Sequence, residues 1–231
     1  MTTPIKATTV NALTTTQRVA LALRAGLHVL LYGPPGTGKS WLARQSLLAA
    51  TNVEPAALVL PEDCAVAELR GHYLPTGQVW QWHDGPLTAA LRHGTPIMLD
   101  EISHASPEAV TFMHSCLDRT HAIELPSRET VIKKPFCAIA TMNDSPDRLR
   151  PALRDRFGVT VHVDRPTDEA YSAMMFGELA RKDANTTSLR SWANLEQAVT
   201  AGLTIEQAAE LIFPDRGQDL IDAIAIASLR K

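Results

Sequence analysis

The chain of 231 residues is long enough for one large domain, or for a core with a small companion domain. Its hydrophobic share of 45% suffices for a packed core, and its net charge of −3 provides no overall field that favours nucleic acid or an anionic membrane. The three cysteines form no CxxC pair and no secretory signal is evident, so we expect reduced thiols in a cytosolic protein. No apolar stretch reaches the roughly 20 residues of a membrane-spanning helix.

Predicted strands and helices alternate along the first two thirds of the chain. After a Thr-rich start over residues 1–16, an amphipathic helix is expected from Thr15. Strands that alternate with helices form parallel sheets covered on both faces. The sequence therefore predicts an α/β core with a parallel five-stranded sheet flanked by helices, with strands over 28–32, 57–60, 96–101, 136–141 and 159–163, and helices over 41–48, from 86, and over 106–119.

Two segments of this core are predicted to be β-hairpins. The first covers residues 68–84, where Gly77 forms a turn between two short β-prone runs, and the second begins at Thr120 and leads into the fourth strand. Trp80 and Trp82 alternate at strand spacing, so they share one face of the first hairpin. That face either packs on the core, as large aromatic residues often do, or projects into solvent.

The strand signals stop after Pro166. Thr167 is a helix N-cap residue followed by two acidic residues, and it opens a helix that is expected to reach about Arg181. Further helices are expected over residues 185–201, 204–213 and 217–229. We therefore place an α/β core over residues 1–166 and a small all-helical domain over residues 167–231.

Residues 33–40 match the phosphate-binding pattern Gly-x4-Gly-Lys-Ser/Thr, between a predicted strand and a predicted helix. Glycines let backbone N–H groups point inward at an anion, and the helix N-terminus adds partial positive charge. Lys39 can reach the β- and γ-phosphate oxygens, and the Ser40 hydroxyl can ligate Mg²⁺. A loop that only turns the chain needs neither the Lys-Ser pair nor the flanking strand and helix, so the sequence predicts a nucleoside triphosphate site. The expected binding set is Gly33, Pro34, Pro35, Gly36, Thr37, Gly38, Lys39, Ser40 and Trp41.

Polar residues that follow two later strands complete a catalytic constellation. Asp100 and Glu101 close the third strand and fit a Walker B element, in which Asp100 would hold Mg²⁺ through its water shell. Glu101 would then orient and deprotonate the attacking water. Asn143 follows the fourth strand, where its amide could bond the γ-phosphate or the lytic water, or could simply turn the chain.

Several arginines cluster over residues 149–158. One of them could neutralise transition-state charge on the nucleotide of a neighbouring subunit. The alternative is a solvated helix face, which is expected for one or two of these residues.

The combination of these motifs resembles an AAA+ ATPase followed by a helical lid, a P-loop NTPase fold. The segment Gly85-Pro86-Leu87, ahead of Leu99-Asp100-Glu101-Ile102, and residues 149–158 are similar to the MoxR group. Residues 149–158 are also similar to the magnesium chelatase ATPase subunit. The resemblance covers nearly all of residues 10–230, and its nucleotide motifs are highly specific.

The resemblance implies roles for single residues. Asn143 corresponds to sensor 1, and Arg156 in Asp-Arg-Phe corresponds to the arginine finger, with Arg154 as the competing candidate. Arg190 offers a sensor 2, although the usual Pro-Arg or Thr-Arg pair is absent. Residues 68–84 resemble the insert in the second helix of this clade, which projects towards the ring pore. Residues 120–134 resemble the hairpin before sensor 1.

The function implied by the resemblance is Mg²⁺-dependent ATP hydrolysis in a ring, with six subunits as the family expectation, to remodel or activate a protein client. Members of the MoxR group include ATPase partners of von Willebrand A domain proteins, Q-type rubisco activases and a gas-vesicle ATPase.

Two other functions share the same core. A nucleic-acid-dependent ATPase, helicase-like or loader-like, would need a basic track, but the second hairpin offers only Arg128, Lys133 and Lys134. A nucleotide-gated switch without motor work is the third hypothesis. The presence of Glu101, Asn143 and Arg156 argues against such a catalytically dead site.

Overall fold

The computed structural model describes residues 13–228, with side chains to residue 224. Residues 1–12 of the Thr-rich start and Leu229, the expected end of the last helix, lie outside the described residues. Two compact units are present. A core unit extends to His162 without residues 34–39, and a helical unit combines Pro34–Lys39 with the chain from Val163 onward. The boundary predicted from sequence, at Pro166, lies three residues after Val163.

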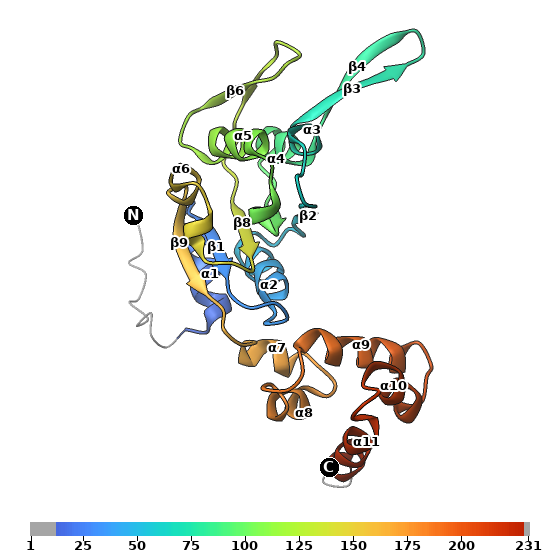
Figure 1. The fold of residues 1–231 in the computed structure, drawn as a ribbon. Helices are drawn as coiled ribbons and strands as arrows, with labels where there is room; N and C mark the ends of the chain where they lie inside the picture. The colour runs from blue at the N-terminus through green and yellow to red at the C-terminus, as the bar shows by residue number, and fades with distance from the viewer. Residues whose placement is uncertain (1–12, 229–231) are drawn as a thin grey trace. The chain divides into compact units, whose positions relative to one another are not determined.

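A five-stranded parallel sheet forms the centre of the core unit, as predicted (Figure 1). Its strand order is β2-β5-β8-β1-β9. The central strand β8 pairs with β1 on one side, where Leu31 lies opposite Thr141, and with β5 on the other, where Leu99 lies opposite Ala140. The carboxyl ends of β1, β5 and β8 therefore meet at one edge of the sheet. The five strands are β1 (His28–Tyr32), β2 (Ala56–Val59), β5 (Ile97–Asp100), β8 (Ala138–Met142) and β9 (Phe157–His162).

Helices pack around this sheet (Figure 1), and its three central strands β1, β5 and β8 are largely buried. Thr14 begins the first helix with a capping box, in which its side chain and that of Gln17 each accept a backbone N–H. Gly94 ends the fourth helix in the left-handed conformation that glycine adopts most easily. The flanking helices are α1 (Thr15–Arg24), α2 (Lys39–Thr51), α3 (Val66–Arg70), α4 (Pro86–His93) and α5 (Pro107–Leu117).

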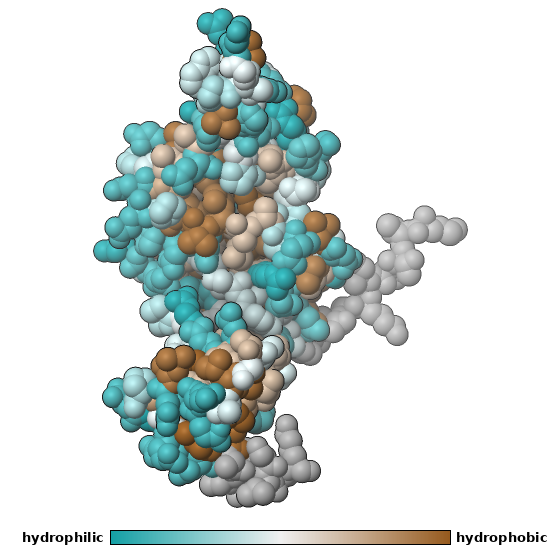
Figure 2. Space-filling model, turned by 90° about the vertical axis from the view of Figure 1, so that its right-hand side faces the viewer, coloured by the Kyte–Doolittle hydropathy of each residue, from teal (hydrophilic) through white to brown (hydrophobic). Residues whose placement is uncertain are grey.

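Both predicted hairpins are present, β3 (Gly71–Thr76) with β4 (Val79–Asp84) and β6 (Ala122–Glu124) with β7 (Thr130–Ile132). The two tryptophans of β4 differ in environment. Trp82 packs against the core and donates its Nε1–H to Asp84 Oδ1 at 2.8 Å, whereas Trp80 is 70% exposed. Brown side chains lie among teal ones at the top of Figure 2, where the hairpins are. The hairpin face therefore packs on the core at its base and projects at its tip.

Arg92, on α4, connects the two hairpins. Its guanidinium donates to Asp84 at the end of β4 and to Glu129 just before β7, with closest distances of 2.7 and 2.6 Å. Partial burial alone would raise the pKa of Asp84, but hydrogen bonds from Arg92 and Trp82 outweigh it and lower that pKa. We call these residues, Arg92 with Asp84 and Glu129, the arginine clamp.

The helical unit contains α7 (Asp168–Ser172), α8 (Gly177–Lys182), α9 (Leu189–Thr200), α10 (Ile205–Ile212) and α11 (Gly217–Ser228). Its core is built around the fully buried Trp192, whose ring lies 5.7 Å from that of Phe213. A helical C-terminal portion is thus confirmed.

The prediction of one continuous helix from residue 168 to about Arg181 is wrong, because the chain breaks between α7 and α8. Phe176 N–H donates to Glu196 Oε1 on α9 at 2.8 Å instead of continuing a helical ladder. At the break the backbone approaches itself so closely that a Cβ on Gly177 would lie 1.8 Å from the Tyr171 carbonyl oxygen. A tertiary contact therefore overrides a local helical preference.

Candidate active site

The phosphate-loop sequence leaves β1 at the edge where the three central strands end. Gly36 and Gly38 have φ values of 77° and 80°, a region that side chains disfavour, so the pattern's glycines are needed for the loop's shape. Lys39 is only 6% exposed, and its Nζ donates to the Pro34 carbonyl oxygen at 2.8 Å. Thr37 Oγ1 donates to the same oxygen at 3.0 Å. The loop thus holds a buried ammonium beside a turn rich in backbone N–H groups.

The Ser and Asp expected to bind a metal are in contact. Ser40 Oγ lies 3.0 Å from Asp100 Oδ1 and 2.9 Å from Oδ2. A hydroxyl and a carboxylate are the oxygen ligands that Mg²⁺ prefers, usually one or two from the protein together with substrate phosphates. Among the described residues no group of three or more His, Cys, Asp or Glu side chains could hold a metal alone. The Ser40–Asp100 pair therefore fits Mg²⁺ bound jointly with phosphate.

Glu101 leaves the strand in a left-handed conformation, with φ 59° and ψ 48°. Asn143 donates its Nδ2–H to Glu101 Oε1 at 2.5 Å. The other carboxylate oxygen, Oε2, is buried without a hydrogen-bond partner among residues 13–228. A buried oxygen that lacks a donor calls for an explanation, and a water molecule that donates its proton there would provide one. The structure thus brings together the predicted Glu and Asn.

Thr141, two residues before Asn143, is not among the site residues predicted from the sequence. Its side chain is 1% exposed, in a strand that is otherwise apolar. The Thr141 hydroxyl donates to Asp100 Oδ1 and accepts the Glu101 N–H at 3.3 Å. A lone polar residue in a buried apolar strand was the available signal, because buried hydroxyls are nearly always bonded to something specific.

The two arginine-finger candidates, Arg154 and Arg156, have different contacts in the structure. Arg154, at the end of α6 (Pro151–Arg154), forms an ion pair with Asp147 at 2.6 Å. Arg156 Nη2 lies 2.8 Å from Nε2 of His114 on α5, and the buried Arg156 Nε has no partner within the described part of the chain. Since a guanidinium only donates, His114 Nε2 accepts this hydrogen bond. Arg154 is thus paired with a carboxylate, whereas Arg156 contacts a histidine ring.

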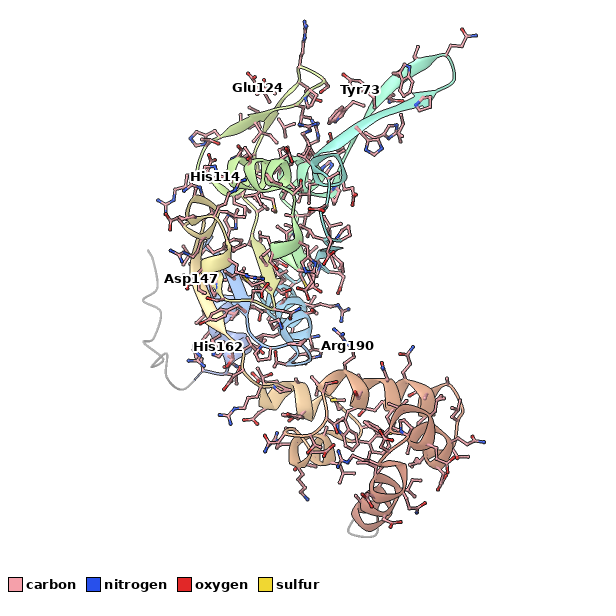
Figure 3. All side chains as sticks on the ribbon, in the orientation of Figure 1. Tyr73, His114, Glu124, Asp147, His162 and Arg190 are labelled. Atoms are coloured by element: carbon pink, nitrogen blue, oxygen red, sulfur yellow. The ribbon has the colours of Figure 1, made fainter. Side chains whose placement is uncertain are left out.

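Two further predicted residues lie at helix starts. Trp41 is half-buried in the first turn of α2, directly after the loop. Arg190 is exposed at the second position of α9 (Figure 3). Within the helical unit, the preceding residue Leu189 donates its N–H to the Gly36 carbonyl oxygen at 3.3 Å. A role for Arg190 or Trp41 in nucleotide binding stays a prediction.

Comparison with known proteins identifies the family of this site. Residues 28–157, more than half of the chain, match the AAA domain of the dynein-related subfamily. The chain belongs to this AAA family. The Paracoccus denitrificans protein NorQ is 33% identical to this AAA protein, over 88% of the chain and 79% of NorQ. The denitrification regulatory protein NirQ of Pseudomonas aeruginosa is 30% identical, over 68% of the chain. These relatives confirm the resemblance to MoxR-type AAA+ ATPases.

The matched region spans 62% of the length of the Pseudomonas aeruginosa NirQ, less than two thirds of that protein. A RuvB variant from Thermotoga maritima has a similar fold, with a TM-score of 0.53 and 20% identity, over 87% of the chain and 72% of RuvB.

Within residues 13–228, no helix has both the length and the apolar character needed to cross a membrane.

Proposed function

We propose that this AAA+ protein hydrolyses ATP at the edge formed by β1, β5 and β8. The observation that carries the proposal is the convergence of Ser40 with Asp100 and of Glu101 with Asn143. The backbone N–H groups of the loop would bind the phosphates, and Lys39 would turn from the Pro34 carbonyl to phosphate oxygens.

The remaining residues supply the chemistry of water attack. Ser40 and Asp100 would hold Mg²⁺, which neutralises phosphate charge when it is bound. Glu101 would accept the proton of the attacking water on Oε2, while Asn143 holds its other oxygen. We assign Glu101 as the general base and Asn143 as the residue that orients it.

We further propose that Arg156 acts on the nucleotide of a neighbouring subunit, in a ring for which six subunits is the family expectation. Its guanidinium forms no ion pair with a carboxylate among the described residues, whereas Arg154 does. A cation whose charge is not cancelled within its own chain is suited to anionic phosphate supplied by another. This contrast favours Arg156 over Arg154.

We also propose that the work of the ring is directed at a protein client. Trp80, Val79 and Leu74 are exposed on the first hairpin, and such apolar side chains fit a protein surface better than phosphate. The nucleic-acid alternative is weakened, because Lys133 is buried and paired with Asp118 at 2.7 Å. A von Willebrand A domain protein is one client class that the MoxR likeness suggests.

Mixing two inactive variants tests the shared site. Glu101→Gln should bind ATP without turning it over, and Arg156→Ala should lower hydrolysis by roughly a hundredfold or more. In a mixture, Glu101→Gln subunits supply Arg156 to neighbours that keep Glu101, so ATPase activity should reappear. Arg154→Ala is the matched control and should hydrolyse within about threefold of wild type. Light scattering checks that the mixed variants assemble. If they assemble and ATPase activity does not recover, Arg156 does not act between subunits.

A capture experiment tests the client. Immobilised Glu101→Gln protein with ATP is exposed to lysate of the source organism, and retained proteins are identified by mass spectrometry. A client should be retained by this column but lost from Lys39→Ala, which binds nucleotide poorly, and from the double variant that adds Trp80→Ser. Retention of nucleic acid alone would instead favour the nucleic-acid-dependent ATPase.

A further inference from the structure

Thr141 is a buried hydroxyl group at the centre of the sheet. Every residue of β8 is buried, and the other four are alanine, isoleucine or methionine. A hydroxyl in such surroundings is costly unless its hydrogen bonds are made. Both of its bonds go to the segment that carries Asp100 and Glu101. The polar residue therefore serves the active-site edge rather than the packing of the sheet.

One hydroxyl holds two neighbouring residues in different ways. As a donor, it bonds Asp100 Oδ1, the same oxygen that Ser40 Oγ approaches to 3.0 Å. As an acceptor, it takes the backbone N–H of Glu101 at 3.3 Å. The donor bond fixes the carboxylate rotamer of Asp100, and the acceptor bond fixes the backbone at Glu101. Because β8 is paired on both sides, the backbone that carries this hydroxyl has a fixed position.

The Glu101 backbone needs such an anchor. Its left-handed φ of 59° is uncommon for residues other than glycine, and such conformations persist when surrounding contacts determine them. Thr141 holds the backbone of Glu101, and Asn143 holds its carboxylate through Oε1. Thr141 near the end of β8 and Asn143 just after it thus define where Glu101 Oε2 points.

We propose that Thr141 is a positioning residue for ATP hydrolysis, whose hydroxyl aligns Asp100 and Glu101 without touching substrate. This inference rests on the proposed function of those two carboxylates. The competing interpretation is that Thr141 only fills the core. Valine has nearly the same shape as threonine, so Thr141→Val removes the hydroxyl and keeps the volume. Thr141→Ser keeps the hydroxyl and removes the methyl group.

The two interpretations predict opposite orders of activity. If the hydroxyl positions the carboxylates, Thr141→Val should lower kcat by roughly ten- to a hundredfold, and Thr141→Ser should stay within about threefold of wild type. The affinity for a fluorescent ATP analogue without Mg²⁺ should change little, because the phosphate loop is untouched. If Thr141 only fills the core, Thr141→Val should be the more active and the more heat-stable of the two.

Thermal unfolding and one further variant pair separate failure of the proposal from failure to fold. Should Thr141→Val not fold, Thr141→Ser is compared with Thr141→Ala, which differ only by the hydroxyl. Wild-type kcat in Thr141→Val or Thr141→Ala, or loss of kcat in Thr141→Ser equal to theirs, overturns the proposal. The variant Glu101→Gln is measured alongside: if it hydrolyses ATP at the wild-type rate, the proposed function falls and this inference with it. If Glu101→Gln is inactive while Thr141→Val is fully active, only the role of Thr141 is refuted.

Discussion

His28, at the start of β1, makes the stability of the core unit sensitive to acid. Its Nδ1 accepts the Ala138 N–H at 3.1 Å, which joins β1 to β8, and its ring lies 5.2 Å from that of Phe136. Burial lowers the pKa of His28 from 6.5 to about 4, with help from the nearby Lys133 charge and against a backbone hydrogen bond with Leu117. The folded protein therefore holds this imidazole neutral.

The sign and size of the effect follow from proton uptake. Below pH 6.5 the unfolded chain protonates this histidine, whereas the folded chain does so only near pH 4. In that window the unfolded state binds more protons, so the free energy of unfolding falls as pH falls. Neutral His28 thus gives full stability above pH 6.5, and about 2 kcal/mol of it is lost by about pH 5.

Urea unfolding followed by circular dichroism, at about pH 7.5 and about pH 5, measures this loss. His28→Asn retains an acceptor for the Ala138 N–H but does not titrate. Wild type should therefore lose about 2 kcal/mol more than His28→Asn between the two pH values. His72→Asn removes an exposed histidine and should follow wild type. Parallel losses in wild type and His28→Asn would refute the reasoning.

Two other contacts lead to structural predictions. Arg92→Met keeps the apolar stem but removes the bonds to Asp84 and Glu129, so amide hydrogen exchange should become faster in both hairpins, by roughly tenfold. Faster exchange in neither hairpin would show that the clamp does not hold them. Gly177→Ala would place a Cβ against the Tyr171 carbonyl, and we expect it to destabilise the helical unit by at least about 2 kcal/mol, measured by thermal unfolding. A melting temperature equal to that of wild type would contradict this.

Much of the core could be predicted from the sequence because its signals are local. Short apolar runs ending in Gly33 and Asp100 indicate strands, and parallel strands place their carboxyl ends at one edge. Contact between Ser40 and Asp100 follows from that topology, although sixty residues separate them. The phosphate-binding motif and the parallel sheet thus both predict that Ser40 and Asp100 lie together.

The remaining features depend on contacts that no local pattern encodes. Arg156 meets His114 across 42 positions of sequence, so its partner could not be inferred from the arginine-rich segment. The break before Gly177 arises from approach to Tyr171 and from a bond to α9. Thr141 looked like any β-prone residue in a strand, since its importance lies in hydrogen bonds to the neighbouring strand β5 and its end.

The arginine clamp has a mechanical consequence. A guanidinium is a planar, rigid fork, and Arg92 directs one side of it to each hairpin. A pull on the tip of β3–β4 is therefore resisted at Asp84 by α4 and, through the same group, by the segment at Glu129. A force on either hairpin is therefore shared by both hairpins, and the two bend together because Arg92 on α4 anchors them to the core unit.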